Sequence, residues 1–75
     1  MLNTNDIVKL SDGIEYLVVS KVNYQGGIYL YLINVADNTN VKFIELYDKE
    51  VIEVSDNSLL DELIKLIVLK ERLNF

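Results

Sequence analysis

Short apolar segments divided by turn signals fill the first two-thirds of this 75-residue chain. The turn signals are rich in Gly, Asp, Asn and Gln, which supply positive φ angles or local side-chain hydrogen bonds. The segments are rich in Val, Ile and Tyr, which suit a pleated sheet. They cover residues 7–10, 14–24, 28–35, 41–47 and 51–54. This pattern predicts an antiparallel meander of four to five strands, all within residues 7–54.

The C-terminal region follows a different pattern, because its apolar residues recur at the spacing of a helix. Ser58, followed three residues later by Asp61, is similar to a capping box, and Lys70 and Arg72 suit the negative end of a helix dipole. The helical apolar positions are Leu59, Leu60, Leu63, Ile64, Leu66 and Ile67. We predict one helix over about residues 58–72, and a single α+β domain, mostly β, over residues 1–75.

Both faces of the predicted sheet are apolar. A two-residue loop at Gln25-Gly26 would place Val22 opposite Tyr29. If the next loop has even length, one face, the expected core, holds Val18, Ser20, Val22, Tyr29, Tyr31, Ile33, Ile44 and Leu46. The other face then holds Leu17, Val19, Leu30, Leu32 and Phe43. An odd-length loop would exchange these sets, because side chains alternate between the faces of a strand.

One helix covers only one face of a small sheet, so the other face needs a second solution. The sheet can curl into a barrel of the SH3-like kind, or the face can meet another molecule. In the second case we expect a homodimer, formed through the sheets or through Leu66, Leu69 and Leu73 of the helices. The predicted interaction residues are Leu17, Val19, Leu30, Leu32, Phe43, Leu66 and Leu69.

The composition offers little for catalysis. The chain has no His and no Cys, so the usual general base, the best nucleophile and the usual zinc ligands are missing. The nearest carboxylates for acid–base chemistry are Glu50, Glu53 and Asp56, which lie in an acidic segment typical of a solvated edge. The candidates for Ca²⁺ are Asp48, Glu50 and Asp56, but their spacing does not match an EF-hand loop. We therefore predict no enzyme activity, no catalytic residues, no metal and no cofactor.

The net charge of -5 disfavours binding to nucleic-acid phosphates, which requires clustered Lys and Arg. The acids concentrate between residues 45 and 62, and this segment is either a solvated edge or a docking surface for a basic partner. The predicted acidic surface consists of Glu45, Asp48, Glu50, Glu53 and Asp56.

Three tyrosines of the central segments offer a different kind of surface. Tyr24, Tyr29 and Tyr31 can be half-buried sheet residues or a platform on which bases or a protein partner stack. Stacked bases would also need a basic track, and near the sheet the chain supplies only Lys9, Lys21 and Lys42. Binding of nucleic acid or a nucleotide through these tyrosines is therefore the alternative to protein binding.

The sequence contains no run of about 20 apolar residues, the length that a membrane-spanning helix needs. The first six residues are mostly polar, lack a basic patch before an apolar stretch and do not resemble a signal peptide. We expect a cytoplasmic protein with no membrane partner.

Three segments carry a resemblance to known proteins: Asp6-Ile7-Val8-Lys9-Leu10, Asp12-Gly13-Ile14-Glu15-Tyr16-Leu17-Val18-Val19 and Tyr29-Leu30-Tyr31-Leu32. They resemble small uncharacterised acidic proteins of low-GC Gram-positive bacteria and their phages or mobile elements, a domain of unknown function. The opening segments are also similar to the small SH3-like barrels of transcription-associated nucleic-acid binders, although the basic loop residues of those barrels are absent. By size and charge the chain is similar to phage proteins that block host defences.

These observations together favour a small non-enzymatic interaction protein, encoded by a phage or mobile element, that binds a partner protein stoichiometrically. An anti-defence inhibitor is one form that such a protein takes.

Overall fold

The computed structural model describes the backbone of residues 2–73 and the side chains of residues 2–70. It contains one five-stranded antiparallel sheet, in the order β1-β2-β3-β4-β5, and one helix. The elements are β1 (Ile7–Lys9), β2 (Glu15–Tyr24), β3 (Gly27–Asn34), β4 (Val41–Tyr47), β5 (Glu50–Glu53) and α1 (Asn57–Leu73). The predicted meander with one C-terminal helix is confirmed, and α1 extends one residue beyond the predicted range at each end.

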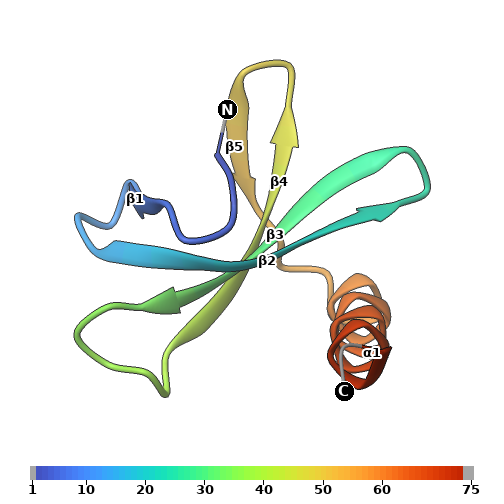
Figure 1. Cartoon of the computed structure of the whole chain (residues 1–75). Helices are drawn as coiled ribbons and strands as arrows, with labels where there is room; N and C mark the ends of the chain where they lie inside the picture. The colour runs from blue at the N-terminus through green and yellow to red at the C-terminus, as the bar shows by residue number, and fades with distance from the viewer. Residues whose placement is uncertain (1, 74–75) are drawn as a thin grey trace.

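The sheet curls into a half-barrel, and α1 packs against its outer side (Figure 1). The helix lies beside the end of β2 and β3 that is far from β1. The helix therefore covers one face of the sheet and curling encloses the other, which is the first of the two solutions that the sequence left open for the second face.

A β-bulge in β2 allows this strand to direct buried side chains to both faces of the sheet. The register shifts between Val18 and Ser20, so Val18 pairs with Leu32 whereas Ser20 pairs with Tyr31. The extra residue turns the later side chains of β2 to the opposite face. The prediction of a uniform β2 face, with Val18 opposite Ile33, was therefore wrong.

The hollow of the half-barrel holds the first hydrophobic core, which we call the inner core. Its buried residues are Tyr16, Val18, Leu30, Leu32 and Ile44. The side chains that close over them come largely from the N-terminal segment and β1, and they are Leu2, Val8, Leu10, Ile14 and Leu46. The inner core thus depends on residues 2–14, which contribute little regular secondary structure.

The second core, which we call the helix core, lies between the sheet and α1. Its buried residues are Val22, Tyr29, Phe43 and Leu63. Around them pack the half-buried side chains of Tyr24, Tyr31, Val54, Leu59, Leu60, Leu66 and Ile67. The apolar helix positions predicted from the sequence thus face the sheet, apart from Ile64, which is exposed.

The loop between β3 and β4 decides which β4 residues enter which core. Ile33 pairs with Val41, so the loop has seven residues, residues 34–40, and its length is odd. Asn34 Oδ1 accepts a hydrogen bond from Ala36 N at 2.8 Å, and Asp37 Oδ1 accepts one from Thr39 N at 3.1 Å. These two side-chain turns give the loop its length, and they send Ile44 to the inner core. The structure therefore has the odd-length alternative, in which Ile44 and Leu46 lie on the face opposite Val22 and Tyr29.

The β2–β3 turn is the two-residue loop that the sequence predicts. Tyr24 pairs with Gly27, and the loop residues Gln25 and Gly26 have φ angles of 49° and 81°. Positive φ at both positions matches the twist of antiparallel strands. Gly27 has no positive φ, and its constraint is steric, because a Cβ there would lie 2.9 Å from the ring of Tyr29.

We predict that Gly26→Val destabilises the fold by about 1–2 kcal/mol, because a β-branched residue resists the left-handed conformation. Urea unfolding followed by circular dichroism measures the change. Asn23→Val, at an exposed strand position of the same hairpin, is the control and should change stability by less than about 0.5 kcal/mol. Equal stability of wild type and Gly26→Val would contradict this account of the turn.

Candidate interaction surface

The start of α1 is fixed by Asp56 rather than by Ser58. Asp56 Oδ1 accepts a hydrogen bond from Ser58 N at 2.9 Å, and Asp56 O accepts one from Leu60 N at 2.9 Å. Asp56 is therefore the N-cap residue, two positions before the residue that the sequence suggested. The cap fixes the residue at which α1 begins after β5, and this position helps to determine which side chains of α1 face the sheet.

Three of the predicted interaction residues lie inside the protein. Leu30 and Leu32 are fully buried in the inner core, and Phe43 is buried in the helix core. They were placed on an uncovered sheet face, but the curl of the sheet covers the first two and α1 covers the third. The accessible surface of this chain therefore does not include them, which corrects the prediction.

The other predicted interaction residues differ in accessibility. Leu17 and Val19 are half-buried on β2, and Leu66 is half-buried in the helix core. Leu69 is 55% exposed on α1. The side chain of Leu73 lies outside the described residues.

An apolar groove runs between α1 and β4. It has a volume of about 260 Å³ and is lined by Tyr31, Val41, Phe43, Ile64, Ile67 and Val68. Its rim is formed by Ile64, Val68 and Val41, which are 50%, 45% and 44% exposed. We call these three residues with their groove the α1–β4 surface. Several exposed apolar side chains gathered from two elements are typical of an interaction site.

Sequence reasoning missed Val41, Ile64 and Val68 as surface residues. Ile64 and Val68 are four residues apart, so they share one side of the helix. This side adjoins the stripe centred on Leu63, which is fully buried. The width of the apolar stripe was the available signal, but which edge of it stays exposed depends on how α1 is rotated against the sheet.

The tyrosines do not form an open platform. Tyr29 is buried, Tyr24 contacts it edge-on with ring centroids 6.4 Å apart, and Tyr31 stacks on Phe43 at 5.0 Å. All three tyrosines belong to the helix core, so α1 occupies the face on which bases would stack. Burial, and next the Glu45 carboxylate, raise the pKa of Tyr29 above its ordinary value.

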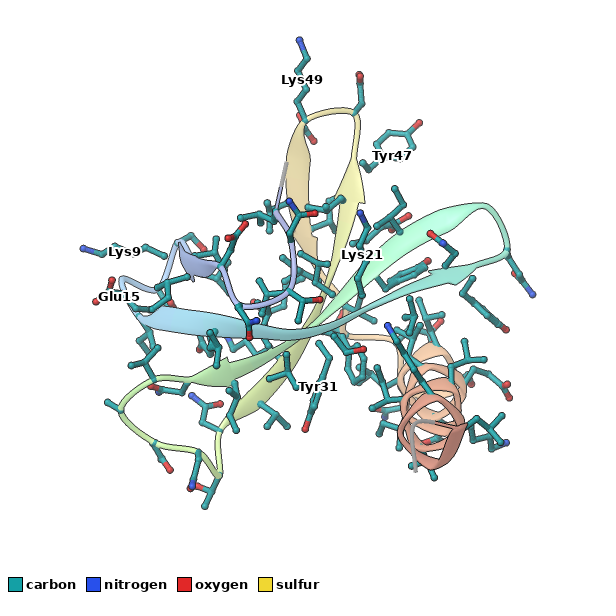
Figure 2. All side chains as sticks on the ribbon, viewed as in Figure 1. Lys9, Glu15, Lys21, Tyr31, Tyr47 and Lys49 are labelled. Atoms are coloured by element: carbon teal, nitrogen blue, oxygen red, sulfur yellow. The ribbon has the colours of Figure 1, made fainter. Side chains whose placement is uncertain are left out.

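The lysines near the sheet are likewise not gathered into a track. Lys9 and Lys49 extend from different ends of the molecule, and Lys21 lies apart from both (Figure 2). Lys42 is paired with two carboxylates. The arrangement that nucleic-acid backbones require is therefore not formed by these residues.

Lys42 forms an ionic bridge across the open side of the half-barrel. Its Nζ lies 3.2 Å from Asp12 Oδ2, in the β1–β2 turn, and 3.0 Å from Glu53 Oε1, on β5. Asp12 also accepts hydrogen bonds from Ile14 N at 2.9 Å and from the hydroxyl of buried Tyr16 at 3.0 Å. The bridge thus links the first turn of the chain to the last strand.

The pKa values of the bridge follow from these contacts. The hydrogen bond from Ile14 N has the largest effect on the pKa of Asp12 and lowers it below 3.8. Burial opposes this shift, and the hydrogen bonds from Tyr16 and Lys42 lower the pKa further. The hydrogen bond to Glu53 is the main cause that raises the pKa of Lys42 above 10.5. The pairs are partly solvated, with 23% of the Lys42 side chain and 56% of the Glu53 side chain exposed. Solvent therefore weakens the interaction.

The predicted acidic surface is divided among different roles. Glu53 belongs to the bridge, Asp56 caps α1, and Glu45 lies beside Tyr29. Asp48 and Glu50 are exposed at the β4–β5 turn. Among the described residues, no three carboxylates are grouped so that they could hold a metal ion.

No helix within the described part of the chain has the length and hydropathy needed to cross a membrane. Comparison of the chain with protein-family models, curated proteins and solved structures found no match.

The bridge predicts a specific pH dependence. A depressed pKa of Asp12 means that its contribution to stability is present above pH 3.8 and is lost as the pH falls through the lower folded-state pKa. Asp12→Asn keeps an acceptor for Ile14 N but removes the charge. We expect it to lower the urea midpoint at neutral pH, and we expect the two proteins to converge as the pH falls below the folded-state pKa.

Asp61→Asn, on the exposed side of α1, is the matched control. Its midpoint should follow that of the wild type at neutral pH, where Asp12→Asn differs. If Asp12→Asn and Asp61→Asn behave alike over the whole pH range, the bridge does not stabilise the half-barrel.

Proposed function

We propose that this protein is a non-enzymatic interaction protein that binds a protein partner stoichiometrically through the α1–β4 surface. The observation that carries the proposal is the exposure of Ile64, Val68 and Val41 around an apolar groove between α1 and β4. Water contact at these side chains costs about 25 cal/mol per Å² of apolar surface, which a partner would recover.

A second copy of the chain is the partner that we propose first. A two-fold axis near Ile64 and Val68 would bring the same apolar patch of each copy together, and cyclic dimers are the commonest oligomers. Dimerisation through α1 retains the part of the sequence-based hypothesis that involves the helix. The part that involves the sheet faces is dropped, because Leu30 and Leu32 are buried.

Stoichiometric binding of this kind fits an inhibitor of a host protein, the role that similarity in size and charge to phage proteins that block host defences implies. The surface that binds a second copy and the surface that binds a host protein would then be the same, and the two partners would compete for it.

Ile64→Lys tests the α1–β4 surface, because a charged side chain buried in an apolar interface is unfavourable. Ile7→Lys is the matched control, since Ile7 is 55% exposed on β1, far from α1. We expect light scattering to give a dimer mass for the wild type, and Ile64→Lys to raise the dimer dissociation constant by about tenfold or more. Ile7→Lys should leave it unchanged.

A monomer mass for the wild type over the whole accessible concentration range would contradict dimerisation. Equal dissociation constants for Ile64→Lys and Ile7→Lys would show that the dimer forms elsewhere. Circular dichroism of both variants confirms that each is folded before the masses are compared.

A further inference from the structure

The half-barrel leaves an open seam between its two edge strands, β1 and β5. Two hollows lie along β5 in this seam. One, of about 270 Å³, is bounded by β1 residues, Ile44 and Val51, and the other, of about 450 Å³, lies between Leu2 and Val51. Val51 lines both hollows, so they follow β5 along its length. We call this space the β5 seam.

The backbone of β5 turns unpaired groups into the seam. In an antiparallel ladder, every second residue directs its N–H and C=O to the neighbouring strand. Val54 N donates to Phe43 O at 2.9 Å, so the groups of Val51 and Glu53 point away from β4. Among the described residues, the backbone of β5 bonds only to β4. Val51 and Glu53, whose backbone groups point away from β4, therefore both line the hollow of about 270 Å³.

The β5 seam offers the groups that an extended strand needs for pairing on one of its sides. Leu46 and Val51 pair on its inner face, and Val8 and Leu10 face them from the β1 side. Lys9, Ser11 and Glu53 also line the hollow beside β1, so its apolar part lies along Val51. Val51 is 45% exposed, although it faces the inner core. A row of outward N–H and C=O groups beside an apolar hollow is filled by an extended chain, which supplies matching backbone groups and an apolar side chain at every second position.

The charge around β5 identifies the kind of chain. The β4–β5 hairpin exposes Asp48 in its turn and Glu50 at the start of β5, against Lys49, while Lys9 lines the hollow from the β1 side. Pairing of β5 with the β5 of a second copy would bring two such hairpins together, and each copy carries a net charge of -5. Like charges on adjacent strands are unfavourable, whereas Lys or Arg on the incoming strand would complement Glu50.

We propose that the β5 seam binds an extended segment of a partner protein in which apolar residues alternate with Lys or Arg. The segment adds a sixth strand beside β5, with its apolar side chains in the seam beside Val51 and its basic side chains beside Glu50. This site is separate from the α1–β4 surface, so it extends the proposed function to a second surface and stands or falls independently of dimerisation.

The probe is a capped peptide, Lys-Val-Lys-Val-Lys, added to the ¹⁵N-labelled full chain. We expect amide shift changes centred on Val51 and Glu53, with slower hydrogen exchange of these two amides when the peptide is bound. The same peptide with an N-methylated central residue cannot pair as a strand, and we expect it to bind about tenfold more weakly. The charge-reversed peptide Glu-Val-Glu-Val-Glu should also bind more weakly.

Two variants test the contacts from the side of the protein. Val51→Pro removes an N–H that points away from β4, which an edge strand tolerates, and it should abolish peptide binding while β4 and β5 stay paired. Glu50→Lys should weaken binding of the basic peptide and favour the acidic one. If Val51→Pro fails to fold, the N-methylated peptide tests the same hydrogen bonds on the wild-type protein.

The proposal is overturned if the peptide shifts no β5 amide at concentrations of about 5 mM, near the weak limit of specific binding. Equal binding of the N-methylated and unmodified peptides would also overturn it, because strand pairing would then play no part. Shifts at Val51 and Glu53 that depend on protein concentration without peptide would show that a second copy fills the seam. Shifts confined to α1 and β4 would assign the peptide to the α1–β4 surface instead.

Discussion

The structure depends on one irregular residue, the bulge at Val19 in the middle of the longest strand. Without it, β2 would present one continuous apolar side, and either the half-barrel or the helix would lose its share of that strand. With it, Tyr16 and Val18 enter the inner core, whereas Val22 enters the helix core. A chain too short for one large core thus builds two small ones on opposite faces of the same sheet.

The features that the sequence predicts well are those that neighbouring residues determine. The five strands, the Gln25-Gly26 turn and the single helix follow from local composition and spacing, and each is present in the structure. The features that it predicts badly are the faces that side chains occupy, because one extra residue in a strand or loop moves all later side chains to the opposite face. The bulge at Val19 reverses the sides of the later part of β2, and the seven-residue loop decides which side of the sheet Ile44 takes. Leu30 and Leu32 lie on the predicted face but are buried, because the sheet curls around them.

The candidate sites show the same division. The exposed acids at Asp48 and Glu50 could be read from composition, and so could the wide apolar stripe of the helix. The bridge of Lys42 to Asp12 and Glu53 could not, because its members are separated by 30 and 11 positions and meet only when the sheet curls. The α1–β4 surface likewise depends on the rotation of α1, which Asp56 and the packing of Leu63 set together.

The order of the strands in the sheet is their order along the chain, and α1 follows all five. During synthesis each strand therefore finds its neighbour already made, and the hairpins can close one after another over short loops, a topology that favours rapid folding. The helix core cannot form until α1 has emerged from the ribosome. Until then the nascent sheet exposes Val22, Tyr29 and Phe43, so the growing chain is most vulnerable to aggregation just before its helix arrives.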